Sequence, residues 1–254
     1  MPNRQTALRW LPAQVLTVAV FCLTPLWLRV PPSTPWFSDL YVSRFVLFIA
    51  MGLTVSVWFL TGMPGFAALR RDRLRAGWML ALLLLAVWMY ASGGWALMRD
   101  RHPELATGAA VQFGMVALFT LVTACVRVPP RWIAAALVFG LIWNAGLAGA
   151  QVAEQGSVGG IFRALGEFPL NVRQQGISYL TAGDARWLRP YGLLPHPNVL
   201  AGWLAVGLLA LTPWLARGRA FLLALIVMAG GLWAFGLTFS RGAWLGLAAG
   251  AVLL

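Results

Sequence analysis

Long apolar runs separated by short polar segments dominate the chain. A membrane span needs roughly 20 apolar residues, because a helix rises about 1.5 Å per residue and the hydrocarbon core is about 30 Å thick. Seven runs meet or approach that length, and an eighth begins near residue 242. The seven are residues 10–28, 45–60, 76–97, 106–126, 132–150, 199–216 and 220–237. The pattern predicts an all-α fold, a polytopic transmembrane helical bundle of seven spans plus the start of an eighth, forming a single membrane domain over residues 1–254.

One segment between the spans, residues 151–197, is much longer than the others. Loops of this length are usually functional or disordered. We expect residues 159–165 and 171–180 to form short amphipathic helices that lie on the membrane surface.

The chain stops within its eighth apolar run, and no polar tail follows. This ending predicts that the sequence is the front portion of a longer protein. Further spans, and catalytic residues with them, are then expected after Leu254.

Composition agrees with lipid as the solvent of this chain. Hydrophobic residues make up 60% of it, charged residues 10%, and the mean hydropathy is +0.77. The net charge of +12 would indicate nucleic acid binding in a soluble protein, but here the arginines lie in short loops between apolar runs. Membrane orientation explains them better, so we expect membrane lipid as a partner and no nucleic acid.

The arginines also favour one orientation. With the amino terminus in the cytoplasm, ten of them fall on the cytoplasmic side with a single acid, Asp72. The nine on the outer side are accompanied by the other six acids. The tight arginine clusters that flank spans all fall on the inner side, as the positive-inside rule requires. Residues 151–197 then lie outside.

The interiors of the predicted spans contain no Asp, Glu, Lys, Arg or His. Proton-coupled transporters and ion pumps commonly place such residues at mid-membrane, so this pattern disfavours both classes. Two amides inside spans, Gln112 and Asn144, are expected to hydrogen-bond between helices. The sequence contains no metal-ligand spacing, P-loop, dinucleotide fingerprint or nucleophile elbow, and we expect no metal and no cofactor.

A first candidate motif closes the long loop, with the sequence Arg189-Pro-Tyr-Gly-Leu-Leu-Pro-His-Pro-Asn198. His196 precedes a proline, which favours extended backbone, and Asn198 can cap the helix that follows. Because this span runs from outside inward, its partially positive amino-terminal end lies at the outer face. Free N–H groups there favour an anion.

A second candidate motif, Thr238-Phe-Ser-Arg-Gly-Ala-Trp244, lies at the next outer turn. Ser240 is a plausible cap, and Arg241 falls in the first helical turn, where its charge opposes the helix dipole. A bound anion would remove that conflict. A diphosphate carries enough charge to engage the guanidinium forks of both Arg189 and Arg241.

Each of these features also has an ordinary structural interpretation. An arginine near a span end is usually an interfacial anchor whose stem snorkels to the headgroups. A lone histidine such as His196 is more often structural than catalytic. The tripeptide Ser240-Arg241-Gly242 has no specificity by itself.

Taken in order, the two motifs resemble those of the O-antigen ligase and polymerase superfamily of polytopic bacterial envelope enzymes. The matching residues are Arg189, Gly192 and Pro197-Asn198 at a span entry, and then an apolar stretch that ends in Ser240-Arg241-Gly242. The resemblance covers about residues 186–246, while the first five spans match only in character.

The resemblance implies a metal-independent membrane glycosyltransferase of the inner membrane, with its amino terminus cytoplasmic and its active face periplasmic. It would transfer a polyprenyl-diphosphate-linked glycan to a lipid A core or a similar lipid or saccharide acceptor. Arg189 and Arg241 would hold the diphosphate of the donor, with support from His196, Asn198, Ser240 and Gly192. The family's catalytic histidine lies in a later outer loop, after the equivalent of Leu254, so His196 does not inherit that role.

Three alternatives remain open on the sequence. The chain resembles equally an O-antigen polymerase or a protein O-oligosaccharyltransferase of the same superfamily. A non-enzymatic transporter of lipid-linked saccharides is the second alternative, and a membrane scaffold with a partner-binding outer loop is the third.

Overall fold

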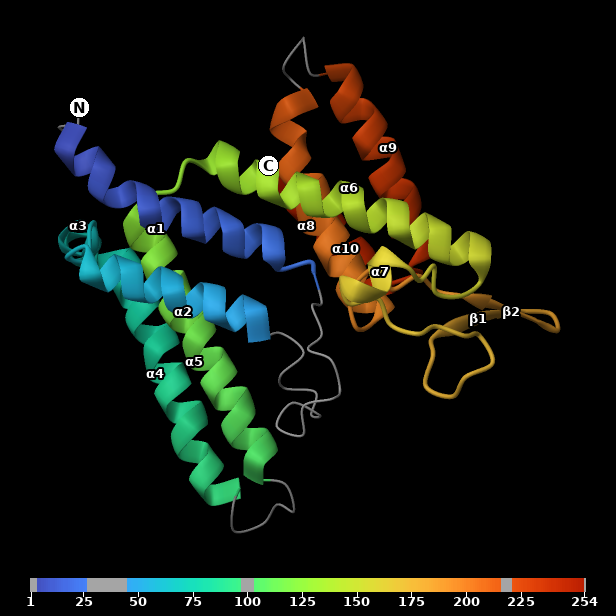
Figure 1. The fold of residues 1–254 in the computed structure, drawn as a ribbon, viewed down its shortest axis with the longest axis horizontal. Coiled ribbons are helices and arrows are strands. Elements are labelled where there is room, and N and C mark those ends of the chain that lie inside the picture. The colour runs from blue at the N-terminus through green and yellow to red at the C-terminus, as the bar shows by residue number, and fades with distance from the viewer. Residues whose placement is uncertain (1–3, 27–44, 97–102, 216–220, 254) are drawn as a thin grey trace. The chain divides into compact units, whose positions relative to one another are not determined.

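The computed structural model describes residues 4–26, 45–96, 103–215 and 221–253, and most of them are helical (Figure 1). The helices and strands are α1 (Arg4–Leu23), α2 (Phe45–Leu60), α3 (Phe66–Arg71), α4 (Arg73–Ala96), α5 (Pro103–Val126), α6 (Pro130–Glu154), α7 (Ile161–Ala164), β1 (Tyr179–Ala182), β2 (Ala185–Leu188), α8 (Pro197–Leu215), α9 (Phe221–Leu237) and α10 (Arg241–Leu253). Four of them, α4, α5, α6 and α8, are long and apolar enough to cross a membrane.

These four helices coincide with the predicted spans 76–97, 106–126, 132–150 and 199–216. The other runs form shorter apolar helices, Trp10–Leu23, Val46–Leu60, Phe221–Leu237 and Arg241–Leu253. The seven-span count therefore stays a prediction. The predicted span ends at 27–28, 97, 216, 220 and 254 lie outside the described residues, as do six of the arginines used for the orientation, Arg29, Arg44, Arg99, Arg101, Arg217 and Arg219.

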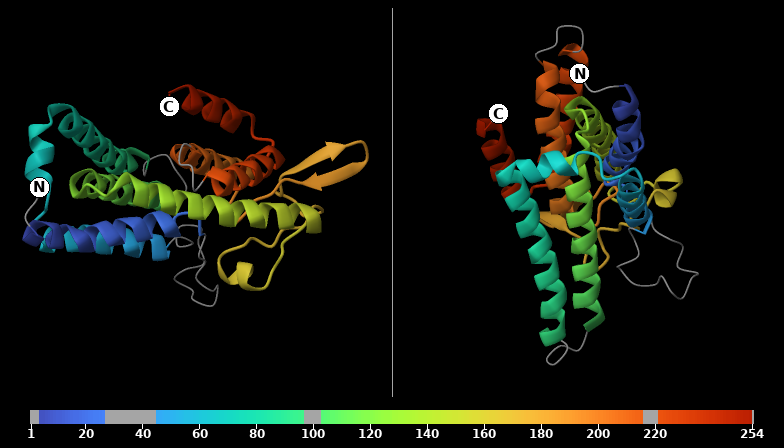
Figure 2. Two further views of the ribbon diagram at one scale, coloured as in Figure 1. Left: turned by 90° about the horizontal axis from the view of Figure 1, so that it is seen from above. Right: turned by 90° about the vertical axis from the view of Figure 1, so that its left-hand side faces the viewer.

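The chain forms two compact units. Unit 1 comprises Met1–Val20 and Asp39–Pro129, and unit 2 comprises Phe21–Ser38 and Pro130–Leu254. Within unit 1, α4 and α5 pack side by side (Figures 1 and 2). Only 6% of the span window in α4 is buried, so this helix leaves its apolar surface free to face lipid. The single membrane domain stays a prediction.

The core of unit 2 lies where α6, α8 and α9 meet. Leu141, Leu204 and Phe235 are fully buried there. A Cβ atom on Gly231 of α9 would come within 2.9 Å of the Leu208 side chain on α8. Small residues at such crossings let helix backbones approach closely, which supplies much of the packing energy between membrane helices.

The long loop between α6 and α8 differs from its sequence-based expectation. Near residues 159–165 it forms only the four-residue helix α7, and residues 171–180 form turns that lead into a strand. The strands β1 and β2 pair antiparallel, with Tyr179 opposite Leu188, and this hairpin projects beyond the helices of unit 2 (Figure 2). The expected helix at 171–180 is wrong because Gly176, at φ +84°, turns the chain, and Gly183-Asp184 then forms a two-residue hairpin turn.

One stripe of amides on α6 anchors this loop. Asn144 and Gln151 are spaced seven residues apart, which places them on one face of the helix, and Gln155 follows its last residue. The helix continues to Glu154, so Gln151 lies inside it and not in the loop. Asn144 accepts a hydrogen bond from the Leu193 N–H at 3.0 Å and donates to its own helix at Gly140. The expected bond from Asn144 to another helix is therefore wrong, while that of Gln112 stays a prediction.

Gln151 uses every hydrogen-bonding position of its side-chain amide. Its Nε2 donates to Glu167 Oε1 at 2.9 Å and to the Gly192 carbonyl at 3.0 Å. Its Oε1 accepts from the N–H groups of Tyr191 at 2.9 Å and Gly192 at 2.8 Å. Glu167, also buried, accepts from the N–H groups of Val158 and Gly159. Both halves of the long loop are thus fixed to α6.

We predict that Gly192→Ala destabilises the protein by about 2 kcal/mol, because strain and a disturbed buried hydrogen bond add together. Gly192 has φ +58°, and a Cβ atom there would lie 2.5 Å from Asn144 Oδ1. Reversible unfolding in mixed micelles measures the effect. Gly230→Ala in α9 is the control, because a Cβ atom at that position meets nothing within 4 Å. Equal stability of the two variants would contradict the prediction.

Candidate functional site

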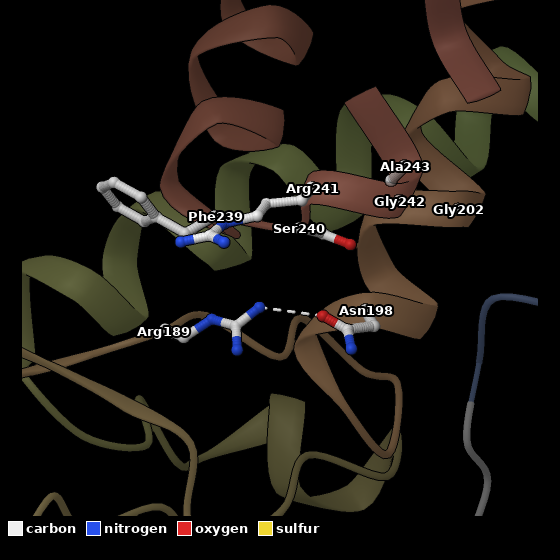
Figure 3. Close-up of a pocket in the computed structure, with 8 residues that line it drawn as sticks. All are labelled: Arg189, Asn198, Gly202, Phe239, Ser240, Arg241, Gly242 and Ala243. Atoms are coloured by element: carbon white, nitrogen blue, oxygen red, sulfur yellow. Dashed lines mark hydrogen bonds between the residues drawn. The ribbon is translucent and has the colours of Figure 1, made fainter. Parts of the chain in front are cut away.

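A hollow of about 590 Å³ lies in unit 2, where α8 and α10 both begin (Figure 3). The described residues that line it are Arg189, Asn198, Gly202, Phe239, Ser240, Arg241, Gly242 and Ala243. They come from the end of the long loop, from one face of α8, from the turn between α9 and α10 and from the start of α10. Both sequence motifs therefore contribute to a single cavity.

Arg189 is held in place by two side-chain hydrogen bonds. Its Nε donates to the Thr238 carbonyl at 2.7 Å, and its NH2 group donates to Asn198 Oδ1 at 2.8 Å. Burial lowers the pKa of the guanidinium from its ordinary value. The electrostatic interaction with Tyr191 raises this pKa, but by less than burial lowers it. A guanidinium has five N–H donors, so three of those of Arg189 remain for a ligand in the hollow.

The turn between α9 and α10 presents the second guanidinium. Phe239 adopts φ +48°, a left-handed conformation that is uncommon outside glycine, and this turn directs the Thr238 carbonyl toward Arg189. Ser240 then begins α10, since its carbonyl accepts from the Trp244 N–H at 3.1 Å. The side chain of Arg241 is exposed, and Figure 3 shows it reaching along the hollow above Arg189.

The two helix starts differ in what they offer an anion. At α8, Pro197 has no N–H, the Asn198 N–H donates to His196 Nδ1 at 3.1 Å, and the next two N–H groups donate to the His196 carbonyl. His196 is therefore the cap, and the expectations of an Asn198 cap and of free N–H groups at this start are wrong. The reason is that Pro197 starts the helix one residue earlier, a position that suits proline.

At α10 the situation is reversed. The N–H groups of Arg241, Gly242 and Ala243 have no acceptor among the described residues, and all three residues line the hollow. Free N–H groups at the positive end of a helix form a ready site for an anion. Within the described residues no carboxylate pairs with Arg189 or Arg241 either, so the hollow carries two uncompensated positive charges.

A serine and a histidine also meet close to the cavity. Ser178 Oγ lies 3.2 Å from His196 Nε2, the spacing of a nucleophile and its base. The other ring nitrogen, Nδ1, accepts a hydrogen bond from Asn198, so the proton of the neutral ring is on Nε2. Nε2 then donates to Ser178 and cannot accept its proton. The pair positions the loop against α8 and does not form an activated nucleophile.

The six residues expected at the site divide into two groups. Arg189, Arg241, Asn198 and Ser240 line one hollow. Gly192 and His196 do not line it, because Gly192 packs on Asn144 and His196 caps α8. Three contributors were missed. Gly202 lies one turn after Asn198 on α8, Thr238 supplies a carbonyl to Arg189, and Gln151 fixes the loop. The only sequence signal for Gln151 was its seven-residue spacing from Asn144.

Among the described residues no three His, Cys, Asp or Glu side chains lie together as ligands for a metal ion. Comparison of the chain with protein-family models, with curated proteins and with solved structures gives no match. The cavity and its chemistry are therefore the basis for assigning a function.

We predict that the stability of the protein falls on acidification through His196. Burial, together with the nearby Arg189 charge, lowers the pKa of this ring below its ordinary 6.5 in the folded state. Its contribution is therefore complete above pH 6.5 and is lost as the pH falls through the lowered folded pKa. His196→Asn keeps a capping oxygen without titrating, so the variant should lose less stability than the wild type between pH 7.5 and 5.5. Thermal unfolding in detergent compares them, and equal losses would contradict the prediction.

Proposed function

We propose that this protein is a membrane glycosyltransferase that binds the diphosphate of a polyprenyl-linked glycan donor in the hollow between α8 and α10. One observation carries the proposal. Arg189 and Arg241, which are far apart in the sequence, line one hollow together with the free N–H groups at the start of α10. A diphosphate matches this arrangement, because it offers several anionic oxygens to separate donors.

The same arrangement suits the chemistry of glycosyl transfer. The acceptor hydroxyl oxygen attacks the anomeric carbon, the bond from that carbon to the phosphate oxygen breaks, and the lipid diphosphate leaves with the electron pair. Negative charge therefore grows on the diphosphate in the transition state. Fixed cations and N–H groups at that position stabilise the transition state more than the ground state.

The proton of the acceptor hydroxyl needs a base. None of the eight lining residues is a histidine or a carboxylate, and His196 is committed to Asn198 and Ser178. We therefore assign the lining residues to binding and to leaving-group stabilisation, and we place the base outside them. We infer the identity of the donor and of the acceptor from the resemblance of the two motifs to O-antigen ligases. The donor would be a glycan, and the acceptor a lipid A core or a similar molecule.

The proposal places the hollow on the periplasmic face of the inner membrane, with the amino terminus in the cytoplasm. The arginine clusters at residues 70–75 and 127–131 support that orientation by their position next to α4, α5 and α6. Donors built on a polyprenyl lipid would approach the hollow from within the bilayer, because the lining begins at the ends of two apolar helices.

We predict that Arg241→Gln lowers kcat for glycan transfer about 100-fold, a typical cost of removing one charge-stabilising donor. Arg241 is exposed and makes no hydrogen bond among the described residues, so the folded state should keep its stability. The measurement is transfer of a tagged polyprenyl-diphosphate glycan to acceptor by the full chain in membrane vesicles.

The matched control is Arg173→Gln, which removes an equally exposed arginine from the outer loop, away from the hollow. Its transfer rate should equal that of the wild type. If Arg241→Gln also transfers at the wild-type rate, the diphosphate role is refuted. Arg189 is less suitable as the first test, because its loss also breaks the bonds to Thr238 and Asn198.

We predict that Gly202→Leu raises KM for the donor at least tenfold without changing the charge of the site. A Cβ atom on Gly202 meets nothing within 4 Å, so a leucine there extends into the hollow without disturbing the packing of α8. Gly202→Ala fills less of the space and should have a smaller effect. Unchanged donor affinity in the leucine variant would show that the donor binds elsewhere.

A further inference from the structure

A second hollow, of about 310 Å³, lies in unit 1 where α4 begins and α5 ends. Three arginines line it, each from a different segment. Arg71 ends α3, Arg75 lies in the first turn of α4, and Arg127 follows α5. Because both helices are long and apolar, this end of the pair marks a boundary between lipid and water.

The charge in this hollow is only partly compensated. Asp72 also lines it, with Oδ2 at 3.2 Å from Arg75 Nε and Oδ1 accepting the Arg75 N–H at 3.2 Å. That carboxylate therefore caps α4 and neutralises one guanidinium. Arg71 and Arg127 have no carboxylate partner among the described residues, so two positive charges face the hollow.

The walls of the hollow are held rigidly. Gly65 has φ +84°, and a Cβ atom there would overlap the Cys125 carbonyl, so the turn before α3 sits directly against the end of α5. The indole of Trp58 donates to the Pro64 carbonyl at 3.1 Å and fixes the same turn. A site that keeps its shape without a ligand loses little entropy on binding.

The end of α5 is fixed in the same way. Gln14 Nε2 donates to the Val126 carbonyl at 3.1 Å and to the Arg127 carbonyl at 3.3 Å. The Arg127 guanidinium lies 6.0 Å from the centre of the Trp10 ring. Contact with a ring face leaves the N–H groups in the guanidinium plane free to bind an anion.

Apolar surface adjoins these charges on two sides. Ala68, Leu69 and Cys125 line the hollow beside the arginines. Leu74 and Trp78, one turn apart on α4, are 78% and 72% exposed. A free phosphate would leave this surface unused, whereas a phospholipid would place its headgroup among the arginines and its acyl chains along α4.

We propose that this hollow binds the phosphate headgroup of an anionic phospholipid. The inference rests on unit 1 alone and is independent of the glycan site in unit 2. Arginines that merely anchor span ends would attract anionic lipid according to their number. Binding in a defined hollow instead depends on which arginines are present. Arg71, Arg75 and Arg127 line this hollow, whereas the neighbouring Arg70 and Arg73 do not.

The test compares two double variants of the full chain in detergent. Arg71→Gln/Arg127→Gln removes the two unpaired guanidinium groups of the hollow. Arg70→Gln/Arg73→Gln removes the same charge from exposed arginines that do not line it. Titration with phosphatidylglycerol, read by native mass spectrometry, gives the affinity of the first bound lipid, and phosphatidylcholine and inorganic phosphate serve as the comparison ligands.

We expect the first double variant to bind phosphatidylglycerol at least tenfold more weakly than the wild type, and the second to bind within threefold. Phosphatidylcholine should bind weakly to all three proteins. Equal losses in the two variants would overturn the inference, since charge alone would then explain binding. Displacement of the lipid by millimolar inorganic phosphate would overturn the lipid as the occupant and leave a free-anion site.

A third variant, which keeps every charge, tests the proposal independently in case the arginine variants misfold. Ala68→Phe places a ring at the hollow and leaves every arginine in position. It should weaken phosphatidylglycerol binding about as much as the first double variant. Wild-type affinity in Ala68→Phe would show that the lipid does not occupy the hollow.

Discussion

The buried side-chain amide of Gln151 fixes the segment on which the candidate site depends. Its four hydrogen bonds join α6 to Tyr191, Gly192 and Glu167. Each of these groups is buried, and an unsatisfied buried polar group costs about 1–3 kcal/mol. The bonds set the path of the backbone two and three residues after Arg189. The position of this loop arginine therefore depends on an amide of α6.

Hydropathy predicted the helical segments, among them the four long apolar helices, while its count of seven spans stays a prediction. Four of the six residues singled out in the two motifs lie in the hollow. These features depend on local sequence, namely apolar runs and turn residues at helix starts. The hairpin at 179–188 was not predicted, because Gly176 and Gly183 turn the chain within an amphipathic pattern. The capping role of His196 was not predicted, because Pro197 starts α8 one residue before Asn198. The pairing of Gln151 with Glu167 could not be predicted, since a hydrogen bond across 16 residues leaves no periodic signal.

The site combines a fixed arginine with a free one. Two N–H groups of Arg189 are hydrogen-bonded to Thr238 and Asn198. The orientation of its remaining N–H groups is therefore fixed before any ligand binds. Arg241 is exposed and unbonded among the described residues, so it can follow a ligand as it enters. The first arrangement would lower the entropy lost on binding, and the second would admit the bulky donor that we propose. A pair of anchoring arginines would not need this division, because a snorkelling side chain needs only water and headgroups.

The start of α4 shows how a carboxylate neutralises a helix terminus in this chain. There Asp72 caps the first turn and pairs with Arg75, so the positive end of the dipole meets a negative charge. The start of α10 has a neutral Ser240 and then Arg241, and Arg189 adds a second charge across the hollow. Both guanidinium groups and the N–H groups of residues 241–243 repel one another in the absence of a counter-charge. An anion in the hollow would remove all of these repulsions at once. This contrast with the Asp72 cap of α4 is the physical basis for proposing an anion site at the start of α10.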